Sequence, residues 1–167
     1  MNADALLWPG LTAATLPRMA TDSAPAPTPG FGMSVRVYYE DTDAGGLVYH
    51  ARYLHYMERA RTEWLRALGF EQDRLRAECG VLFAVRRADV SFLYPARFND
   101  LLRVDARLTH AGRASLEFEQ RVSRSEDGRA CCRALVNIAC IDAERNRPAR
   151  IPEDIMTAIL TETQDGR

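Results

Sequence analysis

The stretch HARYLHYMERARTEWLRAL, residues 50–68, carries apolar side chains at successive spacings of four, three, four and four residues. This period places them in one stripe along a helix. The stripe consists of Tyr53, Met57, Ala60, Trp64 and Leu68. Charged residues, Glu58 and Glu63 among them, fill much of the remaining surface, and Gly69 ends the pattern. We therefore predict a long helix that buries one face against the rest of the fold.

After this helix the pattern changes to alternation or continuous apolar runs, which is typical of strands. The runs cover residues 81–94, 101–108, 115–122 and 130–141, and a shorter one at 35–39 precedes the helix. The connections 109–113 and 125–128 are short and contain glycine, so they fit hairpins rather than the long crossovers of parallel strands. The sequence therefore predicts an α+β fold, with the long helix packed across a five-stranded antiparallel sheet. Shorter helices are expected at 71–79 and 151–160.

Domain organisation follows from length and composition. A chain of 167 residues with 47% apolar content can bury one core but is short for two domains. Residues 1–32 hold five of the eight prolines and show no periodicity, so we predict a disordered extension there. The folded domain is expected at 33–162, with a flexible tail at 163–167. The run at 130–141 is largely apolar on both faces, so its outer face is expected to meet another subunit.

Charge and cysteine content exclude several classes of protein. The formal net charge is −1, so no overall basic field favours nucleic acid, and no run approaches the ~20 apolar residues of a transmembrane helix. Every basic residue is Arg, and the absence of Lys excludes Schiff-base chemistry and the phosphate-loop motif. The four cysteines contain no C-x-x-C pair. They are expected to be small buried side chains in a cytoplasmic protein, without metal or cofactor.

The stretch EDTDAGGLVYH, residues 40–50, places two aspartates, Asp41 and Asp43, and two glycines before the start of the long helix. A calcium loop would need Glu where Arg52 stands, and an aspartyl phosphotransferase would need a parallel sheet. The acids can also be simple turn formers. A functional interpretation is that the free N–H groups of the helix start stabilise an oxygen that becomes negative. Asp43, brought back by Gly45 and Gly46, would then attack the same carbonyl group or activate water against it.

Residues 38–64, with the segments 92–97 and 147–152, resemble the 4-hydroxybenzoyl-CoA thioesterase family, especially the bacterial acyl-CoA thioesterases associated with the Tol-Pal system. The similarity extends from about Val35 to Leu160. It implies a hot-dog fold that assembles as a homodimer or homotetramer. It also implies that Asp43 is the catalytic aspartate, acting as base or nucleophile, and that a backbone N–H at or next to His50 polarises the thioester carbonyl, with the His50 imidazole as a further candidate to assist.

The resemblance further implies a substrate site formed by Gly45, Gly46 and Tyr49. Acyl-CoA is the expected substrate, with acyl carrier protein as an alternative acyl donor. Arg113 and Arg150 lie in turns after core strands and are predicted to bind the coenzyme phosphates, because the planar guanidinium can contact two phosphate oxygens. As an alternative, these arginines are ordinary surface charges.

Two functions therefore remain open on the sequence. The first is a thioester hydrolase, which the intact Asp43 favours. The second is a non-catalytic module that binds acyl-CoA or a protein of the Tol-Pal system. Glu58 and Glu63 are the alternative catalytic acids, because a different hot-dog lineage carries its carboxylate on the central helix. The length of the acyl group, and the choice between direct attack and water activation, are not encoded in any recognisable motif.

Overall fold

A computed structural model describes residues 30–165 of the chain. Its elements, in order, are β1 (Phe31–Arg36), a 3₁₀ turn η1 (Tyr39–Asp41), α1 (His50–Ala67), α2 (Gln72–Arg74), a π-helical turn η2 (Leu75–Cys79), β2 (Val81–Phe92), β3 (Leu101–Ala111), β4 (Ser115–Arg124), β5 (Ala130–Asp142) and α3 (Glu153–Asp165). The predicted order of one strand, a long helix and four strands is confirmed. Among these elements no helix is long and apolar enough to cross a membrane.

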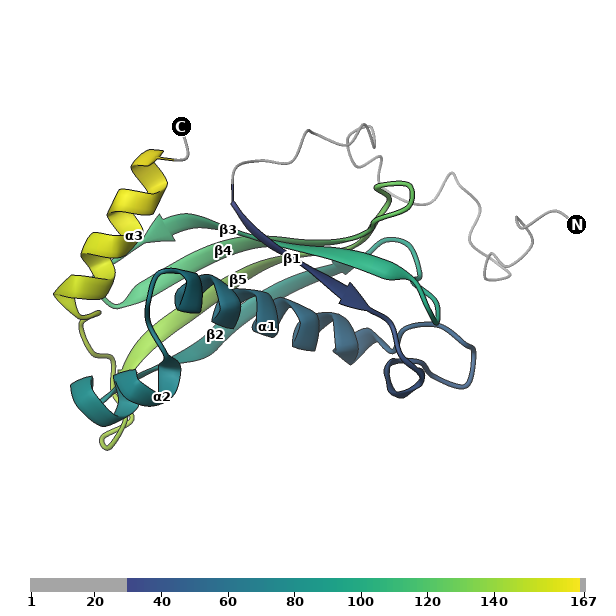
Figure 1. The fold of residues 1–167 in the computed structure, drawn as a ribbon. Helices are drawn as coiled ribbons and strands as arrows, with labels where there is room; N and C mark the ends of the chain where they lie inside the picture. Colours follow the sequence, from purple (N-terminus) through teal and green to yellow (C-terminus); the bar gives the residue numbers. More distant parts are fainter. Residues whose placement is uncertain (1–29, 166–167) are drawn as a thin grey trace, which may run out of the picture.

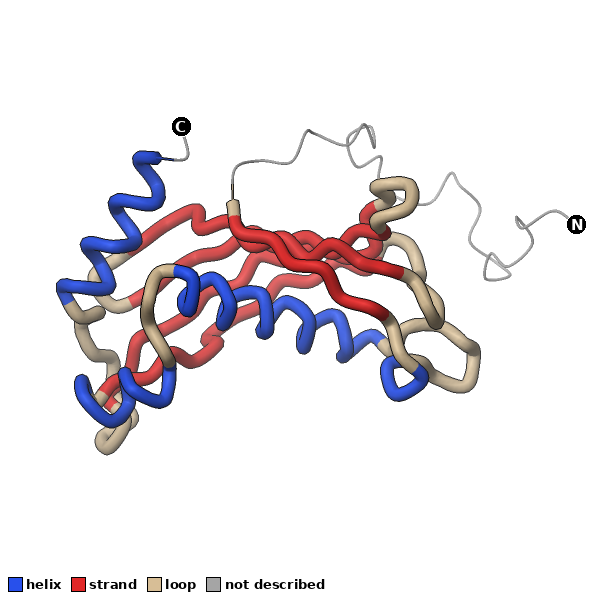
Figure 2. Tube along the Cα trace, viewed as in Figure 1, coloured by secondary structure: helices blue, strands red, loops and turns tan. Residues whose placement is uncertain are grey.

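The five strands form one antiparallel sheet in the order β1-β3-β4-β5-β2. The curved sheet lies along α1, and α3 packs near the end of the sheet where α1 finishes (Figures 1 and 2). This is the predicted α+β hot-dog architecture. Within the described chain β1 and β2 are the two edge strands, so each has one side without a partner strand.

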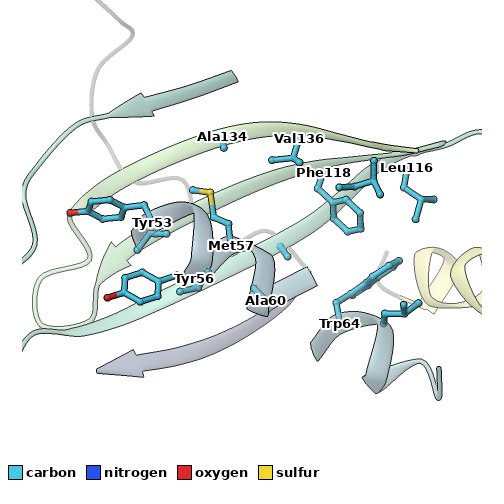
Figure 3. Close-up of a cluster of buried hydrophobic side chains, with 14 of the residues drawn as sticks. Tyr53, Tyr56, Met57, Ala60, Trp64, Leu116, Phe118, Ala134 and Val136 are labelled. Atoms are coloured by element: carbon cyan, nitrogen blue, oxygen red, sulfur yellow. The ribbon is translucent and has the colours of Figure 1, made fainter. Parts of the chain in front are cut away.

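The apolar stripe of α1 forms the centre of the core (Figure 3). Tyr53, Met57, Ala60 and Trp64 are all buried, as the period predicted, and Leu68 is half-buried. Trp64 meets Phe118 of β4 edge-to-face, with ring centroids 4.9 Å apart. Each large apolar side chain in this layer stabilises the fold by about 1.5–3 kcal/mol. This layer fixes which face of α1 meets the sheet.

The first strand begins earlier than the sequence predicted. β1 starts at Phe31 rather than near residue 35, and it pairs Phe31 with Ala106 of β3. The alternation of Phe31, Met33 and Val35 was the missed signal, hidden by the adjoining proline-rich run. Residues 31–32 thus belong to the sheet, residue 30 forms a bend before it, and residues 1–29 of the predicted extension lie outside the described residues.

The C-terminal helix also extends further than expected. α3 continues to Asp165, into the stretch predicted as a tail, and residues 166–167 lie outside the described part. On the outer face of β5, Leu135 is 58% exposed and Ala139 and Ile141 are half-buried. That this face meets another subunit stays a prediction.

Candidate active site

The acidic motif folds into a tight turn directly before α1. Thr42 and Val48 form an isolated antiparallel bridge. Inside it, the N–H of Asp43 donates to the carbonyl of Leu47 at 2.9 Å, and the N–H of Gly46 donates to the carbonyl of Asp43 at 3.0 Å. Gly46 has a φ of +71°, a conformation that glycine adopts without strain. The turn therefore requires the glycine, and it presents Asp43 at the surface.

One oxygen of Asp43 shapes the turn, and the other is available. Asp43 Oδ1 accepts the N–H groups of Gly45 at 2.8 Å and Leu47 at 3.4 Å. Oδ2 has no hydrogen bond or ion pair with the described residues. The interpretation of Asp43 as a turn former is thus correct for half of its carboxylate, while the other half can meet a substrate or a water molecule.

The start of α1 leaves two backbone donors open. Tyr49 is the N-cap residue, and its own N–H donates to the carbonyl of Asp41 at 2.8 Å. The N–H of Arg52 donates to the carbonyl of Tyr49 at 2.8 Å. Between them, the N–H groups of His50 and Ala51 have no acceptor among residues 30–165. No acid lies in the first turn, so the positive end of the helix dipole is not neutralised there.

Aromatic side chains border these donors. The rings of Tyr49 and His50 lie 4.3 Å apart, and Phe92 at the end of β2 lies 6.2 Å from the His50 ring and 5.8 Å from the Tyr53 ring. Asp43, Tyr49 and His50 are all exposed. The structure therefore gathers five of the predicted site residues at one loop–helix junction: Asp43, Gly45, Gly46, Tyr49 and His50. Ala51 lies within the prediction of a donor at or next to His50, since a helix pattern locates the first residue only to within one or two positions.

The segment 92–97, singled out in the sequence, lies against this junction. The N–H of Val48 donates to the carbonyl of Ala96 at 2.9 Å, and Leu47 forms an isolated antiparallel β-bridge with Arg97. The N–H of Ala96 donates to the buried hydroxyl of Tyr53 at 3.0 Å. Burial raises the pKa of Tyr53 to about 12, so it stays neutral and acts as an anchor rather than an acid–base group.

The predicted phosphate ligands lie at the other end of the molecule. The N–H of Ile151 donates to the carbonyl of Arg113, so the turns that hold Arg113 and Arg150 are adjacent. Both turns lie at the end of the sheet where α1 finishes, whereas the Asp43 turn lies where α1 begins (Figure 1). An 18-residue helix is about 27 Å long. Within one subunit, these arginines are therefore distant from Asp43.

The alternative acids occupy less suitable positions. Glu63 pairs with Arg66 on the surface of α1. Glu58 accepts a hydrogen bond from Thr62 and borders a cavity of about 90 Å³ between α1 and the sheet, well along the helix from His50. His55 and His110 are exposed. None of these four side chains has a recorded contact with the Asp43 turn.

Cysteine and metal chemistry find no support in the described chain. Cys131, Cys132 and Cys140 are buried without disulfides, and burial raises the pKa of Cys132 to about 12 and that of Cys140 to about 11. These thiols stay protonated and are poor nucleophiles. Between residues 30 and 165, no three His, Cys, Asp or Glu side chains gather in a way that could hold a metal ion.

Several known proteins are similar to this chain in both sequence and fold. A model of the thioesterase-like superfamily matches residues 37–159. The acyl-CoA thioesterase YbgC of Haemophilus influenzae is 43% identical over 129 residues, which cover 77% of this chain and 93% of that protein. A probable thioesterase from Bartonella henselae superposes with a TM-score of 0.69 at 36% identity, covering 74% of this chain and 99% of that one. A Thermus thermophilus thioesterase, solved with coenzyme A and zinc, gives a TM-score of 0.68 at 32% identity, with coverages of 83% and 97%.

Proposed function

This chain belongs to the thioesterase-like superfamily, and we propose that it hydrolyses acyl-CoA thioesters at the junction between the Asp43 turn and α1. The observation that carries this proposal is the pair of open N–H groups at His50 and Ala51, next to a turn that exposes a carboxylate oxygen of Asp43. Acyl-CoA is the substrate class of the YbgC relative, whose name describes it as an acyl-CoA thioesterase.

In the proposed mechanism the thioester carbonyl oxygen accepts the N–H groups at the start of α1. Negative charge develops on this oxygen as the carbonyl carbon is attacked, and the fixed donors with the helix dipole stabilise it. With Asp43 as general base, a water oxygen attacks the carbon and its proton passes to Asp43 Oδ2. The C–S bond then breaks, and the leaving thiolate of coenzyme A takes up the proton.

Direct attack by Asp43 is the second route to the same products. Oδ2 bonds to the carbonyl carbon, the thiolate leaves, and water then hydrolyses the acyl-aspartate anhydride to the free acid. After a single turnover in ¹⁸O-labelled water, label in the Asp43 carboxylate identifies direct attack, because it requires an anhydride that water opens at the aspartyl carbon. Label in the acid product alone is the result of general-base catalysis and also of an anhydride that water opens at the acyl carbon.

We further propose that a second subunit completes the site. Asp43, Tyr49 and His50 are exposed in one chain, and charge stabilisation by backbone donors is strongest where water is excluded. Among residues 30–165, β2 has no partner strand along its outer edge beside this junction, and Val85 and Phe92 are more than half exposed. A homodimer or homotetramer is therefore expected, and sedimentation at micromolar concentration should reveal no significant monomer. A fully active monomer would remove this part of the proposal.

Arg113 and Arg150 are proposed to bind the coenzyme phosphates of a site on another subunit. Within one chain these arginines lie at the opposite end of α1 from Asp43. They can therefore contact the same substrate when it is bound between two subunits. Arg113 is exposed, and Arg150 has only a 3.4 Å ion pair with the exposed Glu153 to exchange for phosphate. Membership of the Tol-Pal subgroup, a cytoplasmic location and an acyl carrier protein substrate remain predictions from the sequence.

The test is turnover of a thioester panel, with detection of the free thiol that each cleavage releases. The panel should span short and long aliphatic acyl-CoAs and an aromatic one, because the sequence does not predict the length or kind of acyl group. Hydrolysis of at least one member well above the spontaneous rate supports the proposal. Binding measured by calorimetry without any thiol release would instead favour the non-catalytic module.

A further inference from the structure

The two aspartates of the stretch before α1, Asp41 and Asp43, occupy opposite environments. Asp43 is exposed, whereas Asp41 is 3% exposed and no step of the proposed mechanism uses it. The Asp41 carboxylate accepts the N–H of Tyr38 at 2.8 Å and lies 3.5 Å from Nε of Arg52 in the first turn of α1. A buried carboxylate with a guanidinium partner on the following helix is more than a turn former requires, because a turn acid normally bonds only its own backbone.

Three contacts join residues 38–41 to the start of α1. Arg52 forms the ion pair with Asp41, and its Nη2 donates to the carbonyl of Glu40 at 2.6 Å. The third contact is the bond from the N–H of Tyr49 to the carbonyl of Asp41. The buried hydroxyl of Tyr56 lies beside the same carboxylate, outside ideal hydrogen-bond geometry, and burial together with Asp41 raises the pKa of Tyr56 above its usual value.

We infer that Asp41, acting through Arg52, is a positioning residue for the reaction at Asp43. The contacts above, which we call the clasp, hold both ends of the loop 42–48 that carries Asp43. They therefore set where the carboxylate stands relative to the N–H groups of His50 and Ala51. The clasp also occupies the N–H of Tyr49, so only the next two donors are offered to substrate. This inference rests on the proposed function, since it assigns Asp41 a part in the same reaction.

The clasp acts on geometry more than on the fold as a whole. The rest of α1 is held by its buried stripe against the sheet, through side chains such as Met57 and Trp64 that lie beyond the first turn of the helix. Loss of the clasp should therefore leave α1 in place and let the loop move. Misplacement of a reacting group by about 1 Å can cost about 100-fold in rate, so a small displacement is sufficient for a large effect.

The test uses Asp41→Asn, which keeps an acceptor for Tyr38 but removes the charge, together with Arg52→Gln and the double variant. We expect kcat to fall by about 10- to 100-fold with KM for the best acyl-CoA within about two-fold of wild type. The double variant should be no slower than the slower single variant, because both changes break one unit. Asp105→Asn is the matched control, since it breaks an exposed Arg–Asp pair on β3 away from the loop and should leave kcat unchanged.

Amide hydrogen exchange provides a readout that does not depend on activity. In Asp41→Asn, exchange should accelerate at the hydrogen-bonded amides of residues 42–49 while β3, β4 and β5 keep wild-type protection. Arg52→Lys, which keeps the charge but loses the fork geometry, should lie between wild type and Arg52→Gln, and it serves if Asp41→Asn does not fold. Unchanged kcat in Asp41→Asn, additive losses in the double variant, or unchanged exchange at these amides of residues 42–49 would each overturn the inference. A wild-type protein that cleaves no thioester but shows the exchange effect would retain the clasp and reject the proposed function instead.

Discussion

The two ends of α1 are finished in opposite ways. At the C-terminal end, the N–H of Phe70 bonds the carbonyl of Leu65 and the N–H of Gly69 bonds that of Arg66, with Gly69 at a φ of +93°. This is a Schellman motif, which satisfies the last carbonyl groups. At the N-terminal end no side chain caps the helix, and the N–H groups of His50 and Ala51 remain open to ligands, without an acceptor in the described chain. One end is closed for stability, and the other has donors available for chemistry.

The side chains around the two ends of α1 differ in the same way as the backbone groups. Arg66 near the closed end pairs with Glu63 and Glu71, and Trp64 donates its indole N–H to Glu162 of α3. At the open end Tyr49 and His50 remain exposed beside Asp43. A fold with marginal stability gains from closing a helix end, so an end left open indicates a different use. The comparison makes the ends of α1 separable by mutation, with effects on rate at one and on stability at the other.

The largest effect is expected from Asp43→Asn. The amide keeps an oxygen that can accept the N–H of Gly45, so the turn should persist, but it can neither attack the thioester nor take a proton from water. We expect kcat to fall by about 10²- to 10⁴-fold. The measurement is thiol release from the best acyl-CoA of the panel.

Asp73→Asn at the opposite end of α1 is the control for this substitution. Asp73 also bonds a nearby backbone N–H, that of Arg74, and is exposed like Asp43. Its replacement should leave kcat within about two-fold of wild type, since substitutions of surface residues away from the active site and the core are nearly neutral. A variant at Asp43 with near-wild-type kcat would remove Asp43 from the mechanism and direct attention to Glu58.

The next largest effect should come from removing one donor at the open end. His50→Pro deletes the N–H of the first helical residue, a position where proline is favoured and where no hydrogen bond within the described chain is lost. Tyr49, with φ −60° and ψ 132°, already has the extended conformation that precedes proline. We expect a loss of about 10²- to 10³-fold in kcat, as for other oxyanion donors.

His50→Ala separates the backbone donor from the imidazole. It removes the side chain and keeps the N–H, so its loss of kcat should be clearly smaller than that of His50→Pro. Circular dichroism should give the same helix content for both variants. Equal losses in the two variants would transfer the role from the backbone to the imidazole, and the open donors would then have no demonstrated use.

Several of these features were visible in the sequence, for reasons that are physical. The period of α1 follows from the need to bury one face of a helix, and the hairpins follow from glycine in short connections. The environment of Asp41 was not visible. The motif contains two aspartates separated by one residue, and the sequence does not say which of them the folded chain buries beside Arg52. The sequence alone therefore indicates no more than a turn acid at Asp41.

The placement of Arg113 was hidden for a related reason. Spacing along the chain predicts a turn after β3, but it does not give the distance between that turn and Asp43. That distance depends on how α1 lies along the sheet, which is a property of the packed core. The period of the apolar residues identifies which face of a helix is buried. It does not predict which turns of the chain lie near each end of that helix.

A smaller effect on rate is expected from the arginines at the closed end. Arg113→Ala and Arg150→Ala should each lower kcat/KM for a full acyl-CoA by at most about 10- to 150-fold, the range for a hydrogen bond to a charged group. A truncated thioester that lacks the nucleotide should be cleaved at the wild-type rate. Equal losses on both substrates would indicate damaged structure, and no loss on either would leave these arginines as surface charges.

Mixed assemblies test whether these arginines act across subunits. Asp43→Asn chains and Arg113→Ala/Arg150→Ala chains are expected to be inactive or weak alone, but a hybrid can combine an intact Asp43 from one chain with intact arginines from the other. Co-refolded mixtures should therefore recover part of the activity towards full acyl-CoA. No recovery beyond the sum of the separate variants would contradict the proposal that the arginines act across subunits.

The smallest effect, and the one that belongs to stability alone, is expected at the contact between α1 and α3. The indole N–H of Trp64 donates to both oxygens of Glu162, at 2.8 and 3.1 Å, and the apolar face of α3 buries Ile155 and Ile159. Glu162→Ala removes the acceptor and leaves the N–H of a 3% exposed Trp64 without its partner. We expect a loss of about 1–2 kcal/mol in the free energy of unfolding, measured by urea at one fixed protein concentration. Glu162→Gln keeps an acceptor oxygen and should lose less stability.

Because this contact lies at the far end of α1 from Asp43, kcat should stay at the wild-type value in both variants. A fall in kcat without loss of stability would mean that the two ends of the helix are coupled, and the division between them would no longer hold.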